Sequence, residues 1–208
     1  MLPWRRPECI TGAGSLERLP GLLQSAGCKK PMIVASRRQC AAPEFIAMVE
    51  RLPAWSGFHQ VTANPKIETV EQIVTRFRAE GCDSMVAIGG GSPMDAAKAA
   101  AARLARPSRS VAQLKGLLRV HKKIVPFAAV PTTAGTGSET TIAAVVTDEN
   151  HHKYAVNDLC LIPRWAILDP VLTVSLPAGV TAETGLDALT HAVEAYIGRF
   201  YNTRETRD

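Results

Sequence analysis

Asp187 and His191 lie four residues apart in a stretch whose apolar residues have helical spacing. Residues four apart share one face of a helix, and a carboxylate with an imidazole suits a divalent metal ion. A plainer interpretation is also open, because Thr184 and Asp187 have the spacing of a helix cap and a single histidine on a helix is usually structural. The pair therefore indicates a candidate metal site.

A glycine run at residues 89–91 connects an apolar stretch to an alanine-rich one. Glycines let the backbone approach a ligand, and the free N–H groups at a helix start bind anions such as a pyrophosphate. We expect Ser92 to cap this helix, Pro93 to be its first residue and Asp95 to complete a capping box; if no ligand binds here, Asp95 is only a cap and Lys98 only a surface residue. A tight turn without a ligand is the alternative, because the run matches neither GxGxxG nor a P-loop.

A second loop, residues 130–141, consists of small and hydroxylated residues and follows another apolar run. Its backbone amides and the hydroxyls of Thr132, Thr133, Ser138 and Thr141 can surround a phosphate or a ribose. It has no bulky side chain that would block a cofactor. A flexible surface loop is the alternative interpretation.

The positions of these residues depend on the strands and helices that precede and follow them. Short apolar runs at residues 32–35, 85–88, 127–130 and 166–168 alternate with stretches of helical spacing at 43–52, 67–81 and 96–102 and from 181 onward. The alternation is typical of βαβ units, so we predict an α/β fold: a Rossmann-like parallel sheet with helices on both faces. Both loops then lie at the carboxyl edge of the sheet, where such folds bind ligands. Prolines at 170 and 177 interrupt the pattern, and we place a domain boundary near Gly179.

The composition argues against several classes of partner. The formal net charge is +5, from 24 Lys and Arg against 19 Asp and Glu, and the basic residues are too scattered to form a nucleic-acid-binding arm. Five cysteines lie far apart without a CxxC pair, which argues against a disulfide framework and a thiolate zinc site and favours the cytoplasm. No apolar stretch is long enough to span a membrane. We therefore expect neither nucleic acid nor a membrane as partner.

Three segments, GGGSPMDAAK, PTTAGTGSE and TGLDALTHAVEAY, resemble in order and separation the signatures of the iron-containing (group III) alcohol dehydrogenases. The resemblance extends over essentially the whole chain. It implies a domain over residues 1–179 that binds NAD or NADP, followed at 180–208 by the first helix of an all-helical, metal-binding domain, a truncated dehydroquinate synthase-like architecture. It also implies a divalent metal, Fe²⁺ in most members with Zn²⁺ as the alternative, and a small alcohol or aldehyde as substrate.

The resemblance assigns roles to individual residues. Gly90, Gly91 and Ser92 would contact the pyrophosphate, and Asp187 and His191 would be metal ligands. No side chain would act as a nucleophile, because the metal polarises the substrate and the nicotinamide exchanges a hydride with it. The remaining implied cofactor-binding residues are Asn64, Asp95, Thr132, Thr133, Ser138, Thr141, Lys153 and Leu172.

The end of the first predicted strand departs from the family pattern. Many NAD-preferring relatives have an acidic residue there, whereas this chain has Ser36 followed by Arg37 and Arg38. A carboxylate would repel a ribose 2′-phosphate, while a serine beside arginines could bind one. The sequence therefore suggests that Ser36 and Arg37 accept NADP, and the alternative is that the arginines point to solvent.

Length is the second departure. The resemblance implies a longer protein, in which a helical domain supplies further histidine ligands and covers an apolar helix face over residues 181–200. We expect an oxidoreductase whose chain is truncated; the alternative is an inactive nucleotide-binding fragment that needs a separate C-terminal half. A homo-oligomer is also open. A polyol dehydrogenase of the same superfamily fits less well, because the PTTAGTGSE and DALTHAVEAY segments favour the alcohol dehydrogenases.

Overall fold

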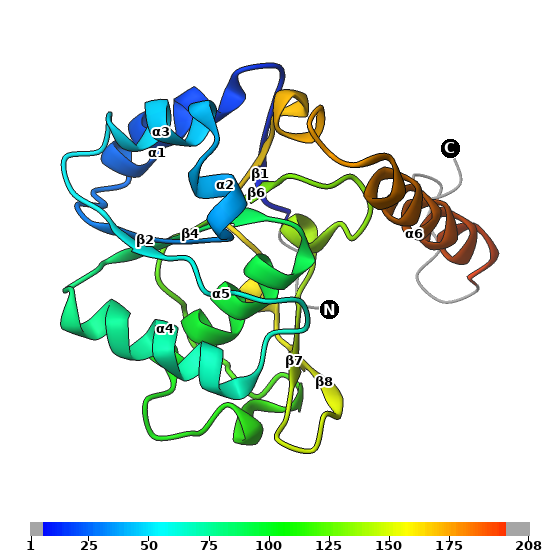
Figure 1. The fold of residues 1–208 in the computed structure, drawn as a ribbon. Helices are drawn as coiled ribbons and strands as arrows, with labels where there is room; N and C mark the ends of the chain where they lie inside the picture. The colour runs from blue at the N-terminus through cyan, green and yellow to red at the C-terminus, as the bar shows by residue number, and fades with distance from the viewer. Residues whose placement is uncertain (1–5, 199–208) are drawn as a thin grey trace.

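The computed structural model describes residues 6–198, and its centre is a six-stranded sheet in which every neighbouring pair of strands is parallel (Figure 1). This confirms the predicted parallel α/β fold and all four predicted strands. The sequence analysis does not identify β1 and β3, the short strands at the two edges. In spatial order the strands are β1 (Glu8–Thr11), β9 (Trp165–Leu168), β6 (Phe127–Pro131), β4 (Ser84–Gly89), β2 (Pro31–Ala35) and β3 (Ser56–Phe58).

Helices cover both faces of this sheet, as predicted (Figure 1). On one face, α1 (Leu19–Ser25) and α3 (Pro43–Val49) bury Leu19, Phe45 and Met48 against the strands. On the other, α4 (Ile67–Ala79) and α5 (Gly91–Ala105) form a second apolar cluster. Because both faces are covered, β2, β4 and β6 are buried along their whole length.

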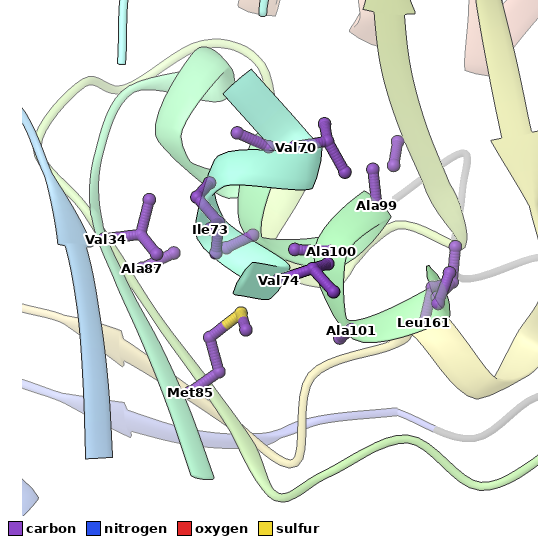
Figure 2. Packing of buried hydrophobic residues seen from close by; sticks show 14 of the residues in the cluster. Val34, Val70, Ile73, Val74, Met85, Ala87, Ala99, Ala100, Ala101 and Leu161 are labelled. Carbon is purple, nitrogen blue, oxygen red and sulfur yellow. The ribbon is translucent and has the colours of Figure 1, made fainter. Parts of the chain in front are cut away.

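The packing of α4 and α5 follows from their sequences. In α4 the buried residues Val70, Ile73, Val74 and Phe77 repeat at helical spacing, and Gly81, with φ +63°, follows the helix in the left-handed conformation. In α5 a run of alanines is buried completely, because small side chains let this helix lie close to both the sheet and α4. Figure 2 shows side chains of α4 meeting these alanines and Met85 of β4.

A smaller sheet interrupts the predicted alternation. In it β7 (Ala143–Thr147) and β8 (Lys153–Asn157) form an antiparallel hairpin, and β5 (Gly116–Leu117) pairs with β8 in parallel. The hairpin packs beside α5 and carries the chain from β6 to β9. Short helical segments complete the fold: α2 (Arg37–Cys40), η1 (Ser15–Arg18), η2 (Ala112–Leu114), η3 (Ser138–Thr140), η4 (Leu159–Leu161) and η5 (Pro170–Thr173).

The long helix α6 (Ala178–Ile197) extends away from the sheet (Figure 1). It begins before residue 181, where the sequence predicts its start, and the predicted boundary near Gly179 falls in its first turn. The helix has no buried residue, and its apolar Leu186, Leu189 and Val193 are exposed, as the sequence predicts for an uncovered face. The end of that face, at residue 200, lies outside the described residues. Within residues 6–198 no helix is long and apolar enough to cross a membrane.

Candidate dinucleotide and metal site

The order of the strands locates a ligand crevice. After β2, the chain places β3 on one side of β2 and β4 on the other, so the order reverses between β2 and β4. In open parallel sheets ligands bind at such a point, beyond the carboxyl ends of the strands. A cavity of about 490 Å³ lies at this edge; Gln39, Thr132 and Leu172, from the loops after β2, β6 and β9, are part of its lining.

The glycine loop after β4 leads into α5, but the helix does not begin as predicted. Gly90 is the residue before the first turn and Gly91 opens the helix, so Ser92 and Pro93 lie inside the first turn rather than at its cap and first position. No side chain caps the first-turn N–H groups of α5, so they are free to bind an anion. The Ser92 hydroxyl instead accepts the N–H of Asn64 at 3.3 Å.

The second loop is held against the first. The Thr132 N–H donates to the Gly89 carbonyl at 2.9 Å, which continues the pairing of β6 with β4. A Cβ atom at Gly90 would lie 3.4 Å from the Thr133 hydroxyl, and one at Gly91 would lie 3.3 Å from Thr136. This segment does not lie wholly on the surface, because Thr132 and Ser138 are buried.

Asp95 and Lys98 are placed differently from the prediction. Asp95 accepts the Ser138 hydroxyl at 3.1 Å instead of completing a capping box. Lys98 is fully buried rather than on the surface, with its ammonium against Ser138, Thr141 and Ala143. Burial raises the pKa of Asp95 to about 6, although Lys98 and the Ser138 hydroxyl act in the opposite direction. Burial likewise lowers the pKa of Lys98 to about 8, against the effect of Asp95 and Glu139.

The hairpin brings two further predicted residues to the same edge. The Thr147 N–H donates to the Pro65 carbonyl, beside Asn64, whose backbone has a positive φ of 55°. Lys153 is exposed and pairs with Thr147 across the hairpin. Asn64 therefore lies at the start of α5, where it bonds to Ser92, and Lys153 lies across the hairpin from Thr147, which contacts Asn64.

The segment after β2 behaves as a short helix start. Ser36 accepts the Gln39 N–H at 3.4 Å, and Arg37 is exposed. Arg38, not Arg37, is part of the cavity lining, and its guanidinium donates to the Ser175 carbonyl at 2.6 Å. Gln39, which the sequence analysis misses, donates to the Thr132 hydroxyl at 3.2 Å. The sequence feature that could have indicated Gln39 is its position one helical turn after Ser36.

Helix α6, which carries Asp187 and His191, meets the second loop at a close contact. A Cβ atom at Gly135 would lie 2.4 Å from the Thr184 carbonyl oxygen, so the loop backbone touches α6. Thr184 and Asp187 lie inside α6, which excludes the interpretation that they cap its start. The His191 Nε2 and Asp187 Oδ1 atoms are 3.8 Å apart and both side chains are partly exposed. Among residues 6–198 no group of three or more His, Cys, Asp or Glu could hold a metal, so no described residue adds a third such side chain to this pair.

The carboxyl edge of the sheet thus combines two loops and a cavity, and the Asp187–His191 pair lies on the neighbouring helix α6. A sequence profile of the family described as iron-containing alcohol dehydrogenase matches residues 7–170. The chain belongs to this family. Family membership and the fold agree with the resemblance found in the three sequence segments.

Relatives of known activity cover the same region. The chain is 39% identical over 198 residues to the NAD-dependent methanol dehydrogenase of Bacillus methanolicus, a match that spans 93% of this chain and 52% of the relative. It superposes on a 1,3-propanediol oxidoreductase with a TM-score of 0.89 and 33% identity, over 95% of this chain and 53% of that one. It superposes on sulfoacetaldehyde reductase from Bifidobacterium kashiwanohense in complex with NAD⁺ with a TM-score of 0.84 and 29% identity, over 94% of this chain and 53% of that one. The chain thus spans about half the length of the relatives it matches.

Gly135→Ala tests the contact between the second loop and α6. The added Cβ would overlap the Thr184 carbonyl, so we expect a loss of about 1–3 kcal/mol in unfolding free energy, measured in urea. Gly21→Ala is the matched control, because Gly21 lies within α1 with nothing within 4 Å of the added atom. That control should be neutral or slightly stabilising. Equal stability of the two variants would contradict the contact.

Asp95→Asn tests the burial of the Asp95 carboxylate. As the pH falls, the folded chain binds a proton near pH 6, whereas the unfolded chain binds it only near the ordinary pKa of 3.8. Protonation therefore stabilises the fold between these values. The unfolding free energy of the wild type minus that of the variant should rise between pH 7 and pH 4, by at most about 3 kcal/mol.

Asp158→Asn is the control of opposite sign. Burial acts to raise the pKa of Asp158, but the N–H groups of Val120, His121 and Cys160 outweigh it and lower that pKa. Its carboxylate stabilises the fold above its unfolded pKa, and this contribution is lost as the pH falls through the lower folded value. The unfolding free energy of the wild type minus that of Asp158→Asn should therefore fall as the pH falls. For Asp95→Asn, a difference that does not change with pH would contradict the burial of its carboxylate.

Proposed function

We propose that this chain binds a nicotinamide dinucleotide at the carboxyl edge of its sheet and supplies that half of a site for hydride transfer with a small alcohol or aldehyde. The observation that carries the proposal is the convergence of the β4 and β6 loops at the carboxyl edge of the sheet, next to the strand-order reversal between β2 and β4 and beside the cavity. Two names among its relatives support it: the methanol dehydrogenase is NAD-dependent, and the sulfoacetaldehyde reductase is described in complex with NAD⁺.

The residues present fit a dinucleotide. The free first-turn amides of α5, at Gly91 and Ser92, suit a pyrophosphate, and Gly90, which has no side chain, lets Thr133 lie close to the same turn. The cavity lined by Thr132 and Leu172 suits the adenosine end. Bound nicotinamide supplies the hydride acceptor or donor, and the chain's part is to bind and orient it.

The metal is a separate question. Asp187 and His191 have suitable chemistry for Fe²⁺, with Zn²⁺ as the alternative, but two protein ligands are fewer than a catalytic site uses. The described residues therefore do not complete a metal site. We propose that Asp187 and His191 are two of its ligands and that the others come from outside residues 6–198.

A second candidate function is a nucleotide-binding fragment that is inactive without a separate C-terminal half. The observations that favour it are the incomplete ligand set and the exposed Leu186, Leu189 and Val193 on α6. A homo-oligomer that covers α6 is a further proposal. All five cysteines are unpaired, which is consistent with our proposal that the protein acts in the cytoplasm.

Calorimetry with NAD and NADP, together with a spectroscopic assay of their reduction by ethanol and 1-propanol in added Fe²⁺, tests these alternatives. We expect binding of at least one dinucleotide. Turnover that His191→Ala abolishes would establish a working metal site, whereas binding without turnover would establish the nucleotide-binding fragment. Binding of neither dinucleotide would overturn the proposal.

The preference for NADP is a finer proposal and rests on Ser36 and Arg37. We expect Arg37→Ala to weaken NADPH binding by about tenfold, the effect of one exposed charge-assisted contact, and to leave NADH binding unchanged. Arg78→Ala is the matched control and should change neither affinity, because Arg78 is exposed on α4 and outside the cavity lining. Equal affinities for NADPH before and after Arg37→Ala would refute a role for that residue.

A further inference from the structure

Lys98 is a buried charge that the proposed function does not use. It is fully buried within α5, among alanines that are also fully buried. Its Nζ atom lies 2.5 Å from the Ser138 carbonyl, 2.9 Å from the Thr141 carbonyl and 3.1 Å from the Ala143 carbonyl. The Thr141 and Ser138 hydroxyls lie 3.0 and 3.4 Å from it as well, so the three N–H donors of the ammonium are satisfied by this one segment.

Packing alone does not explain a lysine at this position. Burying an ammonium is costly unless it is hydrogen-bonded and balanced by charge, and the surrounding positions of α5 are filled by alanine. The charged groups that face Lys98 are Asp95, one turn earlier on α5, and Glu139 in the loop. Asp95 also accepts the hydroxyl of Ser138, so the same loop residue is bonded to both members of the pair.

All of the bonded groups belong to one stretch of chain. Ser138, Thr141 and Ala143 lie where the second loop turns back into β7. The outgoing part of the loop is held differently, by the contacts of Thr133 and Thr136 with Gly90 and Gly91. Lys98 thus fixes the returning part of a loop whose outgoing part lies against the glycines that would face a pyrophosphate.

We infer that Lys98 is a positioning residue: through its three carbonyl contacts, supported by Asp95, it holds residues 131–143 in the shape that receives the dinucleotide. The inference about loop shape stands on these contacts. Only the identity of the ligand rests on the proposed function. Asp95, Ser138 and Thr141 then contribute to cofactor binding by supporting the loop rather than by touching the cofactor.

Lys98→Met tests this role, because methionine keeps the length of the side chain and removes its donors. Two quantities are measured on the full chain well below its melting temperature: hydrogen exchange of backbone amides and calorimetric affinity for NAD. We expect the amides of residues 132–143 to exchange faster and NAD to bind about 10–100-fold more weakly, in line with the loss of hydrogen bonds to a charged group. Amides of β2 and β4 should exchange as in the wild type.

Lys29→Met is the matched control, because the side chain of Lys29 is exposed, outside the cavity lining and the second loop. It should leave both quantities unchanged. Unchanged loop exchange in Lys98→Met, or faster exchange throughout the sheet with unaltered NAD affinity, would overturn the inference, because the latter is the signature of general destabilisation. If the wild type binds no dinucleotide, the proposed function fails and the loop exchange alone decides the role of Lys98.

A measurement on the wild type keeps the inference testable if Lys98→Met does not fold. An ammonium held by three buried carbonyls exchanges its protons slowly, so a ¹⁵N-labelled sample should show a protected lysine NH₃⁺ signal at pH 6. The signal should disappear in Lys98→Arg, which identifies it. Absence of any protected NH₃⁺ signal in the wild type would overturn the inference.

Discussion

The site depends on the pairing of β4 with β6. In that pairing Gly89 lies opposite Pro131, so the two strands end at the same level of the sheet. The bond from the Thr132 N–H to the Gly89 carbonyl carries the pairing one step beyond the strands. Both loops therefore leave the sheet side by side, and the contacts of Gly90 and Gly91 with the threonines of the second loop follow from this register. A Cβ atom at Gly91 would require Thr136 to shift slightly, whereas one at Gly90 would make ordinary contact with Thr133.

Electrostatics adds a second constraint to this edge. The start of α5 presents uncapped N–H groups to the crevice, while the same helix, two turns on, buries an ammonium and its carboxylate partner beneath the second loop. Helix α5 thus presents backbone N–H groups to the crevice and the side chains of Asp95 and Lys98 to the second loop. The opposite shifts of pKa in Asp95 and Lys98 have the same cause, which is the removal of both groups from water.

The sequence predicts the parts of this structure that have a strong period or a strong local preference. The four inner strands and α4 follow from runs of apolar residues, and the carboxyl-edge position of both loops follows from parallel topology. The prediction that Ser92 caps α5 is wrong. The local preference for serine before proline competes there with a tertiary contact, the close approach of the second loop to Gly90. Lys98 was placed on the surface for a similar reason: its carbonyl partners lie 40 or more residues away, and no local pattern identifies them. The roles of individual cofactor and metal residues remain predictions.

The contact of Gly135 with Thr184 joins a ligand-binding loop to a helix that has no buried residue of its own. Because a backbone carbonyl meets a glycine there, neither segment can move closer to the other without displacing it. Coupling of this kind is thermodynamically reciprocal. If a protein surface held α6 against the loop in the shape that a dinucleotide requires, each of the two would strengthen the binding of the other by the same factor. Assembly and nucleotide binding would then be two coupled equilibria, linked through the contact at Gly135.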